Sequence, residues 1–508
     1  MNWSSKFSSL MNLELPSGFC YLDYNATVSA RFCGAWHATA RPARSAANCP
    51  SGAYVRACAP VPHQIAPKRF FRQPVDSERH RSGAAPPRSA AHASPPVVNC
   101  FRTQQAKAAV DTARSQVADF LGCSPDEIIF TSGGSESANY ALRGVCSLCV
   151  LYLSAADAPP LTPPHTTVFP FCSPLTLRHS YPKCHIVTTA FEHYVVPKNI
   201  EHFLEPAGHS ATVVAVLPNG LVDLEAFTAA LTPDTRLVSV MLVQNETGIV
   251  QPIRAICDAA HQVGALVHVD ACQAAGKIPI NVVDLGADLL SIAGHKFSGP
   301  PGTGALFVRR GVDIPPLIVG AAQQGGRRAG TEAVMNCAAM GVACCEAQKW
   351  LSGNGPFFQL GIRGRVVQFI KKWCRDNDVA VVFHGEGSPV VPTVSPPPSL
   401  PKPEYVALRH LFAVLFCLPT HTLQVISVAF PGVVSHEIQL ALKDEVAFSV
   451  GAACNTGKVS ATLCAMGVER NVALGTCRIS FGKDTTEDYI NRGVLKIMEA
   501  CKARLSRK

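Results

Sequence analysis

The chain has 508 residues, of which 47% are hydrophobic, and its mean hydropathy is +0.16. This length suffices for a large buried core and for more than one domain. The apolar runs are short, as at residues 411–418, and the 21 cysteines form no array of close pairs, so the sequence predicts neither a membrane span nor a disulfide framework and indicates an intracellular protein.

The net charge of +9 is concentrated in one segment. Residues 31–100 hold ten Lys and Arg residues and two acidic ones, which accounts for eight of the nine net charges. Because the remainder of the chain is nearly neutral, we expect no nucleic-acid partner. The segment is rich in Ala, Pro, Ser and Arg without periodicity, which indicates a disordered insertion or a product of imperfect gene modelling. Residues 157–183 and 388–417 are predicted to be Pro-rich insertions as well.

Predicted strands and helices alternate along the rest of the chain. The strands are expected at 127–133, 185–190, 235–243, 265–271, 287–294 and 304–310, and helices at 135–144 and 253–264. Apolar strands that alternate with helices are typical of a mostly parallel sheet covered on both faces. In such sheets, ligands bind at the carboxyl ends of the strands.

Polar residues follow several of these predicted strands. Gly133, Gly134 and Ser135 open a helix, where free amides and a hydroxyl suit a phosphate, although an ordinary N-cap by Ser135 also explains the pattern. Asp270 directly follows an apolar strand, and a buried aspartate needs a cationic partner such as a protonated pyridine nitrogen. A simple capping role for Asp270 is the alternative.

Lys296 lies between an apolar run and a stretch rich in Gly and Pro. Desolvating a lysine is costly unless its charge is shifted or its amine is used, and a surface-loop lysine without a chemical role is the alternative. Together with Asn245 and His193 at two further strand ends, these residues describe a pocket for pyridoxal 5′-phosphate. Lys296 would form the Schiff base and Asp270 would hold the ring nitrogen protonated.

The motifs also occur in a familiar order. YLDYNAT, IIFTSGGSES, EHYVVP, NETGIVQPI, HVDACQAAGKIPI, GHKFSGPPGTGALFVRRG, RRAGTE and GAAC resemble those of the cysteine desulfurase and selenocysteine lyase family, in the class V aminotransferase group. The resemblance covers residues 21–30 and about 101–500, apart from the Pro-rich stretches. It implies an α/β enzyme of fold type I that uses pyridoxal phosphate and forms a homodimer. Its large domain would have a mostly parallel central sheet covered by helices, and its smaller domain would be α+β.

The resemblance also assigns roles to individual residues. It implies that Lys296, Cys454 and His193 are catalytic and that His193 also stacks on the cofactor ring. The residues implied to contact the cofactor are Gly134, Ser135, Asn245, Asp270, Gln273, His295 and Thr331, of which Thr331 would reach the phosphate of the other subunit. Asn25 and Arg478 would hold the substrate carboxylate. No metal site is expected.

The same resemblance suggests how the chain divides. Residues 1–30 would belong to the small domain, 31–100 to the insertion, 101–345 to the large cofactor-binding domain, and 346–508 to the C-terminal small domain. The chain departs from the usual pattern within 320–331, at Ala321, Ala322, Gln324 and Gly325, and at Ala293 before Gly-His-Lys.

The substrate is expected to be L-selenocysteine, which would be cleaved to L-alanine and selenium. The sequence SVGAAC around Cys454 and the nonpolar Ala293 favour this activity. Three alternatives remain open: a cysteine desulfurase that makes alanine and an enzyme persulfide, another class V transaminase, and a non-catalytic scaffold. We expect the protein in the cytosol, with a possible acceptor protein for selenium or sulfur.

Overall fold

The computed structural model describes residues 20–21, 101–156, 183–353, 355–386, 424–450 and 459–507. Asn25, Cys454, the predicted insertions at 31–100 and 388–417, and all but the last residue of the one at 157–183 lie outside the described residues. Within the described part of the chain, no helix combines the length and apolarity that crossing a membrane requires.

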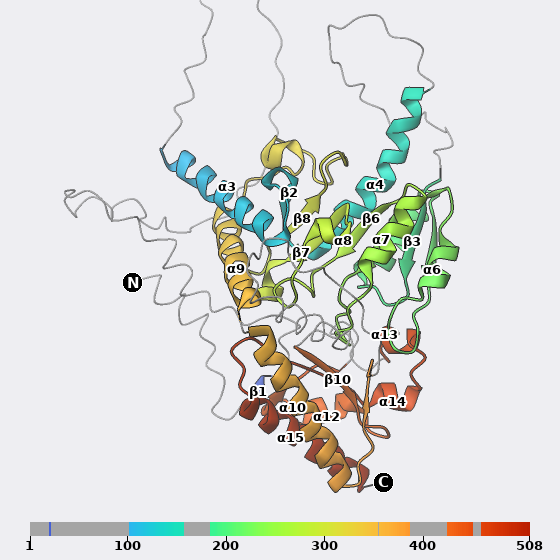
Figure 1. Ribbon diagram of the computed structural model, residues 1–508, viewed down its shortest axis with the longest axis vertical. Helices are drawn as coiled ribbons and strands as arrows, with labels where there is room; N and C mark the ends of the chain where they lie inside the picture. Colours follow the sequence, from blue (N-terminus) through green and yellow to red (C-terminus); the bar gives the residue numbers. More distant parts are fainter. Residues whose placement is uncertain are drawn as a thin grey trace, which may run out of the picture.

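The described residues form a seven-stranded sheet with the order β2-β8-β7-β6-β5-β3-β4 (Figure 1). β8 pairs antiparallel with β2 and β7, and the other pairs are parallel. The strands are β2 (Ile128–Thr131), β3 (His185–Thr189), β4 (Ser210–Val214), β5 (Thr235–Met241), β6 (Leu266–Asp270), β7 (Leu289–Ala293) and β8 (Gly304–Val308). The predicted mostly parallel sheet is confirmed, and β8 is the strand whose reversed direction the sequence pattern did not reveal.

Helices cover both faces of this sheet, which is why its strands are apolar on both sides. In β2, Ile128 and Phe130 pack into one hydrophobic core and Ile129 packs into another. The first core also contains side chains of α3 (Phe101–Leu121), α6 (Leu224–Ala230), α7 (Ile253–Gln262) and α9 (Val334–Ser352). The second contains side chains of α4 (Gly134–Ala156) and α5 (Val195–Asn199).

A third hydrophobic core lies in the C-terminal part of the chain, below the large sheet in Figure 1. It surrounds β10 (Val425–Ala429), which pairs antiparallel with β9 (Val382–Phe383) and β12 (Thr476–Ser480). The helices that contribute to it are α10 (Gly355–Asp376), α12 (Ser435–Ala441) and α15 (Glu487–Leu505). β1 (Cys20–Tyr21) pairs with β11 (Val446–Ala447), which places these N-terminal residues beside this part. The proposed boundary at residue 345 falls within α9, and the division into domains stays a proposal.

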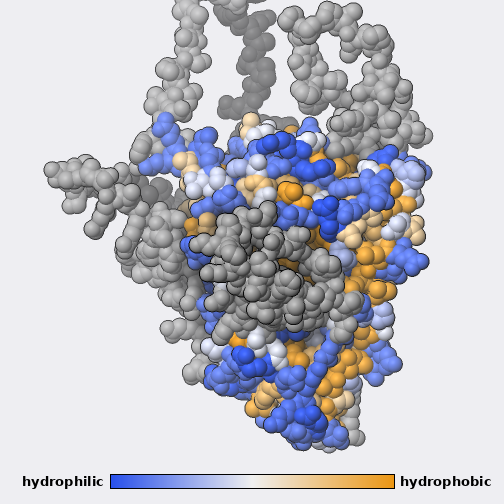
Figure 2. All heavy atoms as spheres, viewed as in Figure 1, coloured by the Kyte–Doolittle hydropathy of each residue, from blue (hydrophilic) through white to orange (hydrophobic). Residues whose placement is uncertain are grey.

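Shorter elements connect these layers. They are η1 (Pro125–Glu127), η2 (Ile200–Leu204), α8 (Val282–Leu285), η3 (Gly294–Phe297), η4 (Gln323–Gly326), α13 (Ala461–Ala465) and α14 (Arg470–Leu474). Figure 2 shows apolar side chains gathered on the flank that holds α6. The exposed apolar residues include Leu224 of α6 and Val213 of the edge strand β4.

Gly304 of β8 packs closely against the turn after β2. A Cβ atom at this position would lie 2.6 Å from both the Gly133 Cα and the Ile292 carbonyl oxygen, and neither backbone atom can yield easily. We expect Gly304→Ala to lower the free energy of unfolding by about 1–3 kcal/mol, which is the usual cost of overpacking. Denaturant unfolding of the full chain measures this change.

Gly364 provides the control for that measurement. It lies on α10, and a Cβ there would meet no atom within 4 Å. Gly364→Ala should therefore stabilise the protein by up to about 1 kcal/mol, since alanine is the better helix former. Equal effects of the two substitutions would contradict the described packing at Gly304.

Candidate active site

A cavity of about 610 Å³ opens where the parallel strands of the large sheet end. Its lining includes residues that follow β2, β3, β5, β6 and β7, together with Arg478 of β12. Most of the residues predicted from the sequence line it: Gly134, Ser135, His193, Asn245, Asp270, Gln273, His295, Lys296 and Arg478. Thr331 is exposed and is not among the lining residues.

The two residues predicted to hold a phosphate, Gly134 and Ser135, lie at the start of α4. The helix begins at Gly134, so Ser135 lies in its first turn, and the alternative of an N-cap by Ser135 is wrong. A Cβ atom at Gly134 would lie 2.3 Å from the Cys272 sulfur. Any larger residue at this position would require the Cys272 side chain to move. The first-turn amides of this long helix lie beside the cavity that Gly134 and Ser135 line, where an anion binds favourably.

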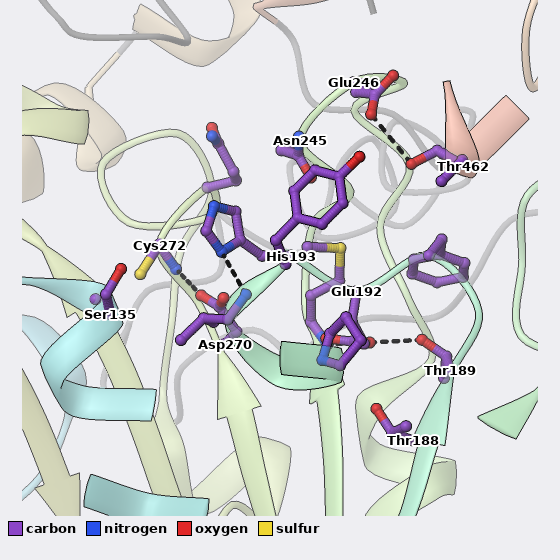
Figure 3. A pocket seen from close by; sticks show the side chains of 18 of the residues that line it. Ser135, Thr188, Thr189, Glu192, His193, Asn245, Glu246, Asp270, Cys272 and Thr462 are labelled. Atoms are coloured by element: carbon purple, nitrogen blue, oxygen red, sulfur yellow. Dashed lines mark hydrogen bonds between the residues drawn. The ribbon is translucent and has the colours of Figure 1, made fainter. Parts of the chain in front are cut away.

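Asp270 ends β6 and is only 7% exposed. Its Oδ1 accepts a hydrogen bond of 2.9 Å from the Cys272 backbone amide (Figure 3). A carboxylate held this way at the wall of a cavity is suited to a cationic ligand atom.

Lys296 lies on η3, directly after β7. The turn that follows is tight: Ser298 adopts a left-handed conformation, and a Cβ atom at Gly299 would lie 2.8 Å from the Gly294 carbonyl oxygen. Burial, with the nearby charges of Lys296 and Lys277, lowers the pKa of His295 to about 4. His295 is therefore neutral at physiological pH and adds no charge beside Lys296.

Gln273 has a buried partner that sequence reasoning missed. The Lys277 Nζ atom donates a hydrogen bond of 2.6 Å to the Gln273 Oε1 atom, and Lys277 is only 3% exposed. Burial lowers the pKa of Lys277 well below its usual range. With its oxygen engaged, Gln273 has its amide N–H groups as the donors for a ligand. The available signal was Lys277 itself, four residues after Gln273 in the motif HVDACQAAGKIPI.

Glu192 is a second residue that the sequence analysis passed over, although it directly precedes His193. Its Oε1 accepts a hydrogen bond of 2.5 Å from the Thr189 hydroxyl (Figure 3). The same oxygen accepts one of 3.0 Å from the Met241 amide. Its Oε2 is buried without a hydrogen-bond partner among the described residues. Burial raises the pKa of Glu192 to about 8, and the Asp270 charge adds to this effect. Glu192 is therefore mostly neutral at pH 7.

Arg478 joins the C-terminal part of the chain to the cavity. It is 3% exposed, and its Nη1 donates to the Asn245 carbonyl oxygen at 3.0 Å. Its Nη2 donates to the Ser449 hydroxyl at 2.8 Å.

The chemistry of this set of groups fits pyridoxal phosphate. Lys296 would supply an amine for the aldehyde, Gly134 and Ser135 a helix terminus for the phosphate, and Asp270 a buried carboxylate for the ring nitrogen, and all four residues line the cavity. His193 adds an exposed imidazole, whose Nδ1 accepts a hydrogen bond from the Val195 amide at 3.2 Å. The cavity volume is also in the range of small-molecule sites. Fold and cavity together define an enzyme of the fold type I class that depends on pyridoxal phosphate.

Comparisons with known proteins agree with this class. Residues 98–149 and 172–353 match the family described as aminotransferase class-V. A probable mitochondrial cysteine desulfurase of Dictyostelium discoideum is 33% identical over 386 residues, which cover 75% of this chain and 71% of the relative. The chain therefore belongs to the class V aminotransferase family, in the group of the cysteine desulfurases, and its cofactor is pyridoxal 5′-phosphate.

Two solved structures show the same fold. A NifS-like protein aligns with a TM-score of 0.60 and 27% identity, over 80% of this chain and 90% of that one. The structure of SspA in complex with cysteine aligns with a TM-score of 0.55 and 26% identity, over 78% of this chain and 91% of that one. The predicted fold class is confirmed.

Glu192 should make stability depend on pH. The folded state holds a proton up to about pH 8 that the unfolded state releases near pH 4.5. Stability should thus fall as pH rises through this window, by up to about 1.4 kcal/mol per pH unit. Since a neutral amide does not titrate, Glu192→Gln should flatten the profile, as measured by denaturant unfolding between about pH 5 and about pH 9.

Glu499, an exposed residue of α15, supplies the matched control. Glu499→Gln should leave the profile as in the parent protein. If the Glu192→Gln profile also matched the parent, Glu192 would not be the protonated group.

Proposed function

We propose that this protein is a cysteine desulfurase, which converts L-cysteine to L-alanine and transfers the sulfur to its own Cys454. The observation that carries the proposal is the convergence of Lys296, Asp270 and Arg478 on one cavity. The sequence favoured L-selenocysteine. The names of the relatives, and the cysteine in the SspA structure, support L-cysteine instead.

The cofactor, when bound, supplies an aldehyde for the substrate amine and an aromatic ring that withdraws electrons from the substrate α-carbon. The proposed task of Asp270 is to keep the ring nitrogen protonated. Gly134 and Ser135 would hold the phosphate, Asn245 and Gln273 would contact the ring hydroxyl, and His193 would cover the ring face.

The remaining residues would act on the substrate. Arg478 would bind the substrate carboxylate, since a guanidinium group pairs well with a carboxylate. Lys296 would remove the α-proton after the substrate amine has displaced it. The Cys454 thiolate would attack the substrate sulfur: an S–S bond forms as the C–S bond breaks, the electron pair stays on the β-carbon, and a proton completes alanine.

A homodimer is part of this proposal. Thr331 is exposed and lies outside the lining of its own cavity. This position suits a residue that contacts the cofactor phosphate of a second subunit. We also propose a separate acceptor protein that takes the sulfur from Cys454.

Cys454→Ser should abolish sulfur release from L-cysteine, by at least about 100-fold, because a hydroxyl is a far weaker nucleophile toward sulfur than a thiolate. The visible absorbance of the bound cofactor should be unchanged, because Lys296 and Asp270 are intact. Sulfide assays and absorbance spectra of the purified protein measure both. Sulfide release at the parent rate would exclude the role of Cys454, and a parent protein without bound chromophore would favour a non-catalytic scaffold.

Substrate preference can be measured as alanine formation from L-cysteine and from L-selenocysteine. We expect activity on both, with the Cys454→Ser substitution affecting L-cysteine far more, because selenium is the better leaving group and depends less on thiolate attack. Alanine formation from L-selenocysteine alone would identify a selenocysteine lyase.

A further inference from the structure

Cys454 belongs to the segment 451–458. The described residues on both sides of this segment are hydrogen-bonded to the cavity wall. On the N-terminal side, Ser449 forms a backbone bridge with Arg478, with N–O distances of 2.8 and 3.2 Å, and accepts the bond from the Arg478 side chain. On the C-terminal side, Ser460 and Thr462 contact Glu246, in the loop after β5.

Glu246 is buried, with 5% exposure, and both of its carboxylate oxygens accept hydrogen bonds. The Ser460 hydroxyl donates to Oε2 at 2.6 Å, and the Thr462 hydroxyl donates to Oε1 at 3.2 Å. Figure 3 shows the second of these bonds at the rim of the cavity. These contacts join residues more than 200 positions apart in the sequence.

The directions of the hydrogen bonds explain why a carboxylate suits position 246. The Leu463 amide donates to the Ser460 hydroxyl oxygen, and the Gln244 side-chain amide donates to the Thr462 hydroxyl oxygen. Each hydroxyl has a single proton of its own, which is therefore directed at Glu246. A carboxylate accepts at both oxygens, whereas a glutamine has one acceptor. Burial raises the pKa of Glu246, while the Ser460 hydrogen bond and the charge of Arg478 oppose that shift.

We propose that Glu246 is a positioning residue for the sulfur-transfer step. It fixes the chain immediately after the cysteine-bearing residues, acting through Ser460 and Thr462 and not on the cofactor. The proposal rests on the function proposed above, and it deepens that function by assigning a role to a residue of the QNETG motif that the substrate and cofactor roles leave unused.

Two reactions of the full-length holoenzyme separate this role from a general structural one. Sulfur release from L-cysteine, with dithiothreitol as acceptor, requires Cys454. Exchange of the α-proton of L-alanine in deuterated water would require Lys296 and the cofactor site but not Cys454. In Glu246→Gln, sulfur release should fall at least about tenfold, which corresponds to about 1.4 kcal/mol of lost stabilisation, while the exchange rate stays within about twofold.

Two further variants and a structural measurement complete the test. Ser460→Ala and Thr462→Val remove the partner hydroxyls and should produce the same separation of the two rates. Hydrogen-exchange mass spectrometry should show faster amide exchange over residues 459–466 in Glu246→Gln. The control is Glu445→Gln: Glu445 is exposed and forms its ion pair with Lys496 of α15, so both rates should match the parent.

The proposal is overturned if Glu246→Gln releases sulfur at the parent rate, or if its two rates fall together. Should Glu246→Gln fail to fold, the Ser460→Ala and Thr462→Val variants decide by the same criteria. A parent protein that releases no sulfur, or a Cys454→Ser variant that still does, contradicts the proposed function instead. In that case the amide exchange of residues 459–466 still reports whether Glu246 fixes this segment.

Discussion

The cavity depends on a buried histidine that joins three strands. His268 of β6 bonds through Nδ1 to the Ser239 hydroxyl of β5, at 2.9 Å, and through Nε2 to the Ser291 hydroxyl of β7, at 2.8 Å. Burial lowers the pKa of His268 to about 4, so the ring is neutral and adds no charge to the core. The ends of these strands carry Asn245, Asp270 and Lys296, and the relative positions of those groups therefore follow from the alignment that His268 helps to maintain.

The cavity lining also includes two carboxyl groups, those of Glu192 and Asp270. Glu192 binds the Met241 amide, and Met241 is the pairing partner of Asp270 across β5 and β6. Two adjacent buried negative charges would each destabilise the other. Keeping Glu192 protonated removes the second charge, so that Asp270 can face a cationic ligand atom as an anion. A carboxyl group whose pKa is raised by burial and by a neighbouring charge, as for Glu192, is typical of functional sites.

Strand and helix patterns predicted the sheet, and the residues after each strand predicted most of the cavity, because the ends of parallel strands must meet at one edge. The reversed β8 was missed because an apolar strand of five residues carries no mark of its direction. The hydrogen bond from Lys277 to Gln273 and the neutral state of Glu192 were missed for another reason. Both depend on how deeply a side chain is buried, which neither motif shows.

Arg478 shows most clearly what a motif leaves out. Its proposed task, binding a carboxylate, follows from the chemistry of a guanidinium group at a matching position. Its bonds to the Asn245 carbonyl and to Ser449 follow only from the way β12 packs beside the loop after β5. Glu246, the next residue after Asn245, makes the corresponding contact with Ser460. Through the adjacent residues Asn245 and Glu246, one loop of the large sheet thus contacts both Arg478 and Ser460. The geometry of the proposed substrate binding and of the proposed sulfur transfer would therefore depend on the same short loop.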